Sequence, residues 1–243
     1  VSQLPAQFGG AYQVTAGQGR IGQFTFLMLM FFLMIVGIIY VEQGQRRIPI
    51  QFAKRVRGRK VMGGQSTYIP LKVNSAGVIP VIFATSILFF PALVATSLPQ
   101  DNSVTAAIRN WIDVNLANSQ GTTWFYIFFL GILIIFFTYF YTTIQFDPVR
   151  QSDMIRRQGG FVPGVRPGIS TTNYLSHIIN RITLPGSIFL ASVAVLPSIA
   201  SAIWDIPLGF SGISILITVG VALETMKQIE SQLSMRNYEG FID

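Results

Sequence analysis

The sequence has 243 residues, of which 51% are hydrophobic and only 11% are charged, and its formal net charge is +7. A soluble domain carries about 25% charged residues, so this composition predicts an all-α protein that crosses a membrane several times. The chain has no Cys and a single His, which excludes disulfides, thiolate metal sites and His-based metal clusters. Apart from the sequence GFSG at 209–212, no motif indicates a catalytic residue, a metal ligand or a cofactor.

The chain begins at Val1, without Met and without the pattern of a secretory signal peptide. Its opening sequence, LPAQFGGAYQVTAGQGR, is polar and rich in Gly, as in a connection between two membrane helices. We therefore expect a fragment, a processed product or one part of a split chain.

Five stretches without any charged residue predict the membrane helices. They cover 21–41, 73–100, 114–146, 182–204 and 206–223. Because about 20 helical residues cross the hydrocarbon core, each stretch can hold one span. We expect helices at 23–41, 77–98, 123–144, 182–203 and 209–228, the last of which extends past the charged Glu224.

The basic residues predict which way the helices face. Eight Lys and Arg lie in 44–72, five in 150–181 and two after the last span, against only Arg20 and Arg109 in the other connections. Because basic residues accumulate on the cytoplasmic side, the N-terminus is expected outside and the C-terminus in the cytoplasm. The predicted segments are extracytoplasmic at 1–22, 99–122 and 204–208, and cytosolic at 42–76, 145–181 and 229–243.

The first cytosolic loop combines strong basic charge with a strand pattern. Apolar and polar residues alternate along 48–52 and again along 68–73, on either side of the sequence VRGRKVMGGQ. Alternation with a period of two around a Gly pair predicts a β-hairpin whose basic tip is 55–60. Pro49 and Pro70 favour strands at the edge of a sheet.

The second span contains two prolines, Pro80 and Pro91, among many small residues. An interior proline removes a backbone hydrogen bond and tends to kink a helix, and small residues allow neighbouring helices to approach. The pattern fits an ordinary, tightly packed membrane helix, or a bent helix at a moving interface.

In the second cytosolic loop, residues 145–177 contain four Gly, three Pro and four Arg. Residues 161–168 (FVPGVRPG) cannot continue a helix, and they predict an ordered, extended turn that presents Arg166. The alternative is a solvated loop whose Arg residues only satisfy the orientation rule.

Four long motifs resemble the SecY family, the central subunit of the bacterial protein-conducting channel. They are VEQGQRRIPIQFAKR, GRKVMGGQSTYIPLKVNSAGVIPVIFATSILFFP, FDPVRQSDMIRRQGGFVPGVRPGISTTNYL and FSGISILITVGVALE. The resemblance covers the whole chain and corresponds to the C-terminal half of the family, its sixth to tenth membrane helices. The plug and the other gate helices of the family belong to the half that this sequence lacks.

The resemblance implies one half of an inverted-repeat channel in the bacterial cytoplasmic membrane. The second span is similar to the family's lateral-gate helix. The implied pore ring is Ile82 and Ile217, with Val78 as a weaker candidate, and the implied gate residues are Pro80, Phe90 and Pro91. The implied docking residues are Arg55, Arg57, Arg59 and Lys60 in the first loop and Arg156, Arg157 and Arg166 in the second.

The partners that the resemblance implies are the N-terminal half of SecY, SecE, SecG, the SecA motor or a ribosome, signal peptides and nascent chains, and membrane lipid. Elementary physics agrees with these roles. A ring of branched aliphatic side chains forms a flexible seal that holds little water and makes no hydrogen-bond demand on a passing chain. Positive loops suit ribosomal RNA phosphates and acidic motor surfaces.

An intramembrane serine protease is a first alternative, because 209–212 reads GFSG at the start of a span. A serine nucleophile needs a base within hydrogen-bond reach. The single His, His177, is predicted at the cytoplasmic entrance of the fourth span and Ser211 at the outer end of the fifth, about 30 Å apart. The spacing therefore argues against a protease.

A secondary transporter for a small solute is a second alternative, and proline-interrupted helices would suit it. However, ionisable residues inside the membrane are the usual mark of ion coupling, and the central part of every predicted span lacks them. The middle of the last span is Ile, Leu, Val and Gly, so any path that it lines is apolar. Glu224 lies near the inner end of that span and is expected to snorkel toward water or to pair with Lys227.

A passive scaffold that contacts ribosomes or lipid is a third alternative. Basic loops alone would permit it, since each Lys or Arg near an anionic membrane contributes about 1 kcal/mol. Loss of ribosome or motor binding with translocation intact, after Arg166→Glu, would favour this scaffold.

Overall fold

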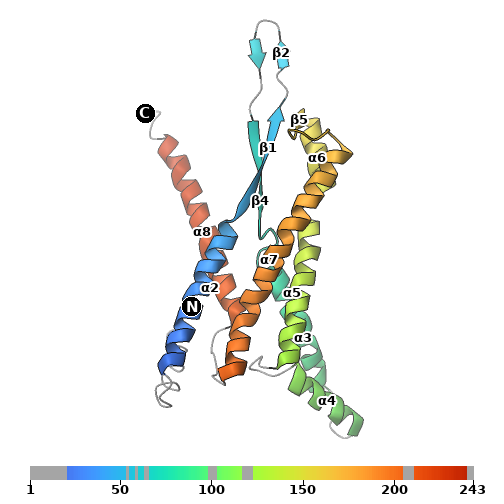
Figure 1. Cartoon of the computed structure of the whole chain (residues 1–243), viewed down its shortest axis with the longest axis vertical. Coiled ribbons are helices and arrows are strands. Elements are labelled where there is room, and N and C mark those ends of the chain that lie inside the picture. The colour runs from blue at the N-terminus through green and yellow to red at the C-terminus, as the bar shows by residue number, and fades with distance from the viewer. Residues whose placement is uncertain are drawn as a thin grey trace.

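In the computed structural model, long helices run side by side and a narrow β-sheet rises from one end of them (Figure 1). The structure describes residues 21–52, 55–57, 60–62, 66–97, 103–116, 123–204 and 211–239. Within these residues, five helices are long and apolar enough to cross a membrane. They are α2 (Ile21–Gln43), α3 (Ile79–Ser97), α5 (Trp124–Gln145), α7 (Ile169–Trp204) and α8 (Gly212–Glu239). The predicted class of an all-α polytopic membrane protein is confirmed.

The strands come from both loops at the sheet end of the molecule. β1 (Gln45–Phe52) pairs with β4 (Ser66–Lys72) in antiparallel register, which confirms the predicted hairpin. β2 (Arg55–Arg57) and β3 (Lys60–Met62) form a second ladder at its tip. A third strand that the sequence did not predict, β5 (Gly160–Phe161), pairs with β1 and gives the sheet order β4-β1-β5.

The helix core lies between the five long helices, and each contributes side chains to it. Its buried members include Met34 and Ile38 of α2, Val81 and Leu88 of α3, Leu130 and Ile134 of α5, Leu190 of α7 and Leu216 of α8. Buried hydroxyls in these helices bond to their own backbone: Thr138 Oγ1 donates to the Ile134 carbonyl at 2.7 Å and Ser187 Oγ to that of Leu184 at 2.9 Å. These two buried hydroxyls therefore need no hydrogen-bond partner from another helix.

Two predicted helices are too short, and two further helices were missed. α7 begins at Ile169 rather than 182, and α8 continues to Glu239 rather than ending at 228. The predicted loops also contain α4 (Ser103–Asn115) and α6 (Pro148–Arg157). A stretch without charges marks only the part of a helix that lies in the hydrocarbon core, so it does not show how far the helix extends beyond the membrane. The first turns of α7 are instead stabilised by Leu175 and Ile178, which pack beside the sheet.

The predicted kink at Pro80 is not supported. α3 begins at Ile79, so Pro80 lies in the first turn, where a backbone N–H has no partner within the helix in any case. Only Pro91 lies inside α3 and removes one of its hydrogen bonds. A distortion of α3 is therefore expected near Pro91.

Candidate functional site

The two loops at the sheet end form one packed unit. A second hydrophobic cluster joins Ile48, Ile50 and Leu71 of the hairpin to Ile155 of α6, and it also contains Val162, Leu175 and Ile178. β1 and β5 add backbone pairing, with Gln51 opposite Phe161 and Phe52 opposite Gly160. The basic hairpin is therefore fastened to the Arg-bearing second loop, with the backbone pairing at the outer end of β1.

Gly160 makes this junction possible. A Cβ at this position would lie 3.0 Å from Ile50 Cγ2, 3.0 Å from Phe52 Cε1 and 3.2 Å from Ile155 Cγ2. These contacts are tighter than ordinary van der Waals packing, so any side chain would push the hairpin away from α6.

Gly160→Ala is expected to loosen the junction by about 1–3 kcal/mol, because overpacking a close contact forces the neighbours to move. Hydrogen exchange of the β1 and β5 amides would measure the change as faster exchange in both strands. Gly131→Ala on α5 is the matched control, since a Cβ there meets nothing within 4 Å. Equal exchange in the Gly160→Ala variant and the parent would contradict the proposed role of Gly160.

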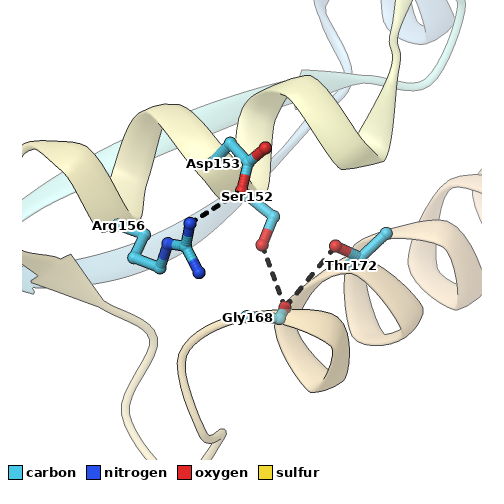
Figure 2. Close-up of polar contacts among 5 residues, drawn as sticks. All are labelled: Ser152, Asp153, Arg156, Gly168 and Thr172. Atoms are coloured by element: carbon cyan, nitrogen blue, oxygen red, sulfur yellow. Dashed lines mark hydrogen bonds and ion pairs between the residues drawn. The ribbon is translucent and has the colours of Figure 1, made fainter.

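The turn that carries Arg166 is built from backbone conformation and hydroxyl contacts. Gly164 and Gly168 have φ of 83° and 108°, a region that side chains other than glycine rarely adopt. Figure 2 shows Ser152 of α6 and Thr172 of α7 donating to the Gly168 carbonyl, at 3.1 and 3.5 Å. Thr171 Oγ1 donates to the Arg166 carbonyl at 3.0 Å, and the Arg166 side chain remains exposed. The ordered turn predicted at 161–168 is therefore present.

Helix α6 presents the two other arginines of this loop. Asp147 caps its N-terminus by accepting from the backbone N–H of Val149 at 2.9 Å and of Arg150 at 3.4 Å. Arg156 lies 3.8 Å from Asp153 (Figure 2), and the Arg156 side chain is mostly exposed whereas that of Asp153 is half exposed. Arg157 is also exposed, so it and Arg166 present positive charge without a partner carboxylate in the described part of the chain.

The tip of the hairpin extends away from the helices (Figure 1). Arg55, Arg57 and Lys60 lie on the β2–β3 ladder, where Arg57 stands opposite Lys60 and Arg55 opposite Met62. The fourth predicted docking residue of the tip, Arg59, lies outside the described residues.

The three pore-ring candidates lie near the point where Val78, just before α3, approaches α8. Val78 Cγ1 lies 3.7 Å from where a Cβ would stand on Gly220 of α8. Ile82 follows Val78 by one helical turn, as its N–H donates to the Val78 carbonyl at 3.3 Å, and its side chain is 44% exposed. Ile217 precedes Gly220 by three residues and is half-buried. The structure thus leaves an aliphatic surface open beside this contact.

The remaining gate candidates lie further along α3. Phe90 is 64% exposed, and Pro91 is partly buried inside the helix. The polar residues of α3 do not need outside partners, because Ser86 Oγ donates to the Ile82 carbonyl at 2.7 Å and Thr85 Oγ1 to the same carbonyl at 2.9 Å. This span can therefore face lipid or an apolar path.

Ser211 has a structural role that accounts for the GFSG motif. Its Oγ accepts from the Ile213 N–H at 3.1 Å, and its carbonyl accepts from Ser214, so Ser211 caps the start of α8. That start lies at the end of the bundle opposite the sheet, whereas His177 lies in the early part of α7 near the sheet (Figure 1). The two side chains are not brought together.

A polar contact that the sequence analysis missed joins α2 to the segment before α3. The buried Asn74 donates from Nδ2 to Glu42 Oε1 at 2.6 Å and to the Gly77 carbonyl at 3.3 Å. Glu42 also lines a cavity of about 440 Å³ with Lys72, Glu224 and Lys227. The expected Glu224–Lys227 ion pair is not among those of the described residues. An Asn just before a helix was the available signal, but its partner lies 32 residues away.

Comparison with known proteins identifies the family. The sequence model of SecY matches residues 1–226. The chain is 47% identical to the protein translocase subunit SecY of Streptomyces coelicolor over 98% of its length and 55% of that relative, and 48% identical to that of Mycobacterium tuberculosis over 90% and 51%. It therefore spans about half the length of the curated relatives it matches.

Solved structures support the same fold at lower identity. A structure described as that of a protein conducting channel aligns with a TM-score of 0.55 and 17% identity, over 92% of this chain and 53% of the other. A second, from work on the plug domain of SecY and the closed state of the channel, aligns with a TM-score of 0.56 and 17% identity, over 92% and 54%. With five apolar helices, these matches indicate a multi-pass protein of the cell membrane. The chain belongs to the SecY family.

Proposed function

We propose that this chain is the C-terminal half of the pore-forming subunit of a protein-conducting channel. In this role it passes unfolded polypeptides across the membrane and releases apolar segments sideways into lipid, without catalysing a chemical reaction. The observation that carries the proposal is the SecY match over residues 1–226. The open aliphatic surface beside the approach of Val78 to Gly220 supplies a physical basis, because such a surface can border a path that binds no particular side chain.

Ile82 and Ile217 are suited to form part of one ring. α3 starts at the sheet end and α8 finishes there, so the two helices run in opposite directions (Figure 1). From the Val78–Gly220 contact, Ile82 lies about 6 Å further from the sheet and Ile217 about 4.5 Å, at 1.5 Å per residue. The two isoleucines therefore reach nearly the same depth, as a ring requires. In the proposed channel, the partner half supplies the rest of the ring.

The sheet end is proposed to face the cytoplasm. It holds most of the basic residues of the chain, as the orientation rule requires. The packed hairpin and second loop carry the exposed Arg157 and Arg166 on one unit, and the β2–β3 tip extends beyond it (Figure 1). We propose that this unit binds the SecA motor or a ribosome, and that SecE and SecG bind elsewhere on the assembled channel.

Reconstitution tests the proposed function directly. The chain is placed in vesicles with or without a polypeptide that supplies the first five helices, and then receives SecA, ATP and a signal-bearing polypeptide. Protease-protected polypeptide is expected only when both halves and the motor are present. Failure of the two halves to co-purify, or proton-driven uptake of a small solute by the chain alone, would contradict the proposal and favour a transporter.

Reversing Arg55, Arg57 and Arg59 to Glu should remove contacts to RNA phosphates and weaken ribosome binding by at least about tenfold at low salt. The loss should be smaller at high salt, because salt screens the same contacts in the parent. Co-sedimentation of ribosomes with channel vesicles over a salt series measures the effect. Arg109→Gln, at the opposite end of the molecule, should leave binding unchanged. A loss that does not vary with salt would indicate misfolding and not a lost phosphate contact.

A further inference from the structure

Helix α4 connects α3 to α5 at the end of the bundle opposite the sheet, and it projects outward on the side away from α8 (Figure 1). Four of its large apolar residues recur at a spacing of three or four, which places them on one arc of the helix. They are Val104, Ile108, Trp111 and Val114, whereas the partly buried Ile112 lies to one side of this arc. Arg109 and Asp113 lie on the opposite arc, where Arg109 Nε stands 3.8 Å from an Asp113 carboxylate oxygen. The helix is thus amphipathic, and its two charges cancel.

The apolar arc faces away from the protein. Val104, Ile108, Trp111 and Val114 are 68%, 47%, 53% and 58% exposed. On the opposite arc Ala106 and Asp113 are exposed as well, and Asp113 helps to line a cavity of about 720 Å³ with Thr85 and Ser86 of α3 and Tyr126 of α5. A surface helix in water keeps its apolar arc inward. The exposed arc of α4 therefore calls for an apolar environment outside the chain.

Aromatic residues of α4 and α5 indicate which environment surrounds this arc. The Trp111 ring lies 5.5 Å from that of Phe125, edge to face, at the start of the spanning helix α5. The neighbouring Trp124 is 63% exposed, as is Phe128 one turn further, at 64%. Tryptophans collect where a membrane span meets the headgroups. The outward arc of α4 is thus continuous with the exposed surface of α5 at the level where that span begins.

We infer that α4 is an interfacial membrane helix, with its apolar arc in the boundary between lipid headgroups and acyl chains. Its 13 residues are too few to cross the bilayer, which takes about 20. Binding comes from the buried apolar area, because the cancelled charges leave no preference for anionic lipid. The helix holds the α3–α5 connection at the membrane surface. This requires only that α3 and α5 cross the bilayer, in either orientation and for any transported substrate.

Spin labels on single cysteines test the inference, since the chain has no Cys of its own. Ile108→Cys places the label on the apolar arc and Ala106→Cys on the polar arc, and both positions are exposed. The labelled full chain is reconstituted into vesicles of phosphatidylcholine and phosphatidylglycerol. Collisions with oxygen, which concentrates among acyl chains, are then compared with collisions with a water-soluble nickel chelate. The oxygen-to-nickel ratio is expected to be several-fold higher at 108 than at 106.

Two results would overturn the inference. High nickel accessibility at both positions would place α4 in water. A label at 108 that is shielded from both reagents would show that protein covers the arc, either another polypeptide or another copy of this chain. Phe128→Cys on α5 provides the reference for a lipid-facing position, so a low ratio at 108 beside a high ratio at 128 counts against an interfacial helix. Translocation assays are not needed, so failure here is distinct from failure of the channel proposal.

Discussion

Arg166→Glu is expected to reduce motor-driven translocation by more than about tenfold while the fold stays intact. The turn around Arg166 is held by Gly164, Gly168 and hydroxyl contacts to backbone carbonyls, and the guanidinium itself takes no part. Arg offers a fork of donors that pairs bidentately with a carboxylate. Losing one partner of such a pair at an interface costs about 2–5 kcal/mol, and each 1.4 kcal/mol is tenfold. ATP-driven protection of a secretory polypeptide in vesicles measures the rate.

The control for this variant is Arg150→Glu, which reverses another exposed arginine on α6. An equal loss in both variants would point to net charge and not to the turn. An unchanged rate in Arg166→Glu would refute its docking role. Separate measurement of SecA binding distinguishes the scaffold alternative, which predicts lost binding with translocation intact.

Ile82→Asn and Ile217→Asn are each expected to raise the resting ion conductance of the channel several-fold. A constriction lined by aliphatic side chains excludes water, whereas an amide in the ring offers hydrogen bonds that stabilise water and ions there. Because the two residues lie at nearly the same depth, the double variant should leak more than either single variant. Planar-bilayer recording of the assembled channel, with no substrate or motor present, measures the conductance.

Conservative substitutions in the ring and one substitution away from it serve as controls. Ile82→Val and Ile217→Val keep the ring aliphatic and should stay sealed. Ile132→Asn, at a 49% exposed position on α5, should also leave conductance near the parent value. Conductance equal to the parent in both Asn variants of the ring would count against the assignment of these residues as the seal.

Local sequence patterns predicted much of the fold. Charge-free stretches predicted the five spans because lipid requires about 20 apolar residues in a helix, wherever the partners lie. Alternation along 48–52 and 68–73 predicted the β1–β4 pair because a half-buried strand repeats every two residues. Gly and Pro predicted the Arg166 turn because each residue type sets its own backbone conformation, whatever lies around it. The amphipathic pattern of α4 was also present in the sequence, but it lay in a stretch read as a loop.

What the sequence determined by itself was the membrane class, the number of spans, the basic hairpin and, through its motifs, the SecY family. The tertiary structure alone decided that β5 pairs with the hairpin, that Ile50 and Phe52 pack closely against Gly160, and that Val78 lies near Gly220. It also decided that Ser211 caps α8 and does not face His177, and that the apolar arc of α4 points outward. The physical reason is distance along the chain. A period or a charge reports what one segment needs from its surroundings, whereas these contacts depend on which distant segment supplies it.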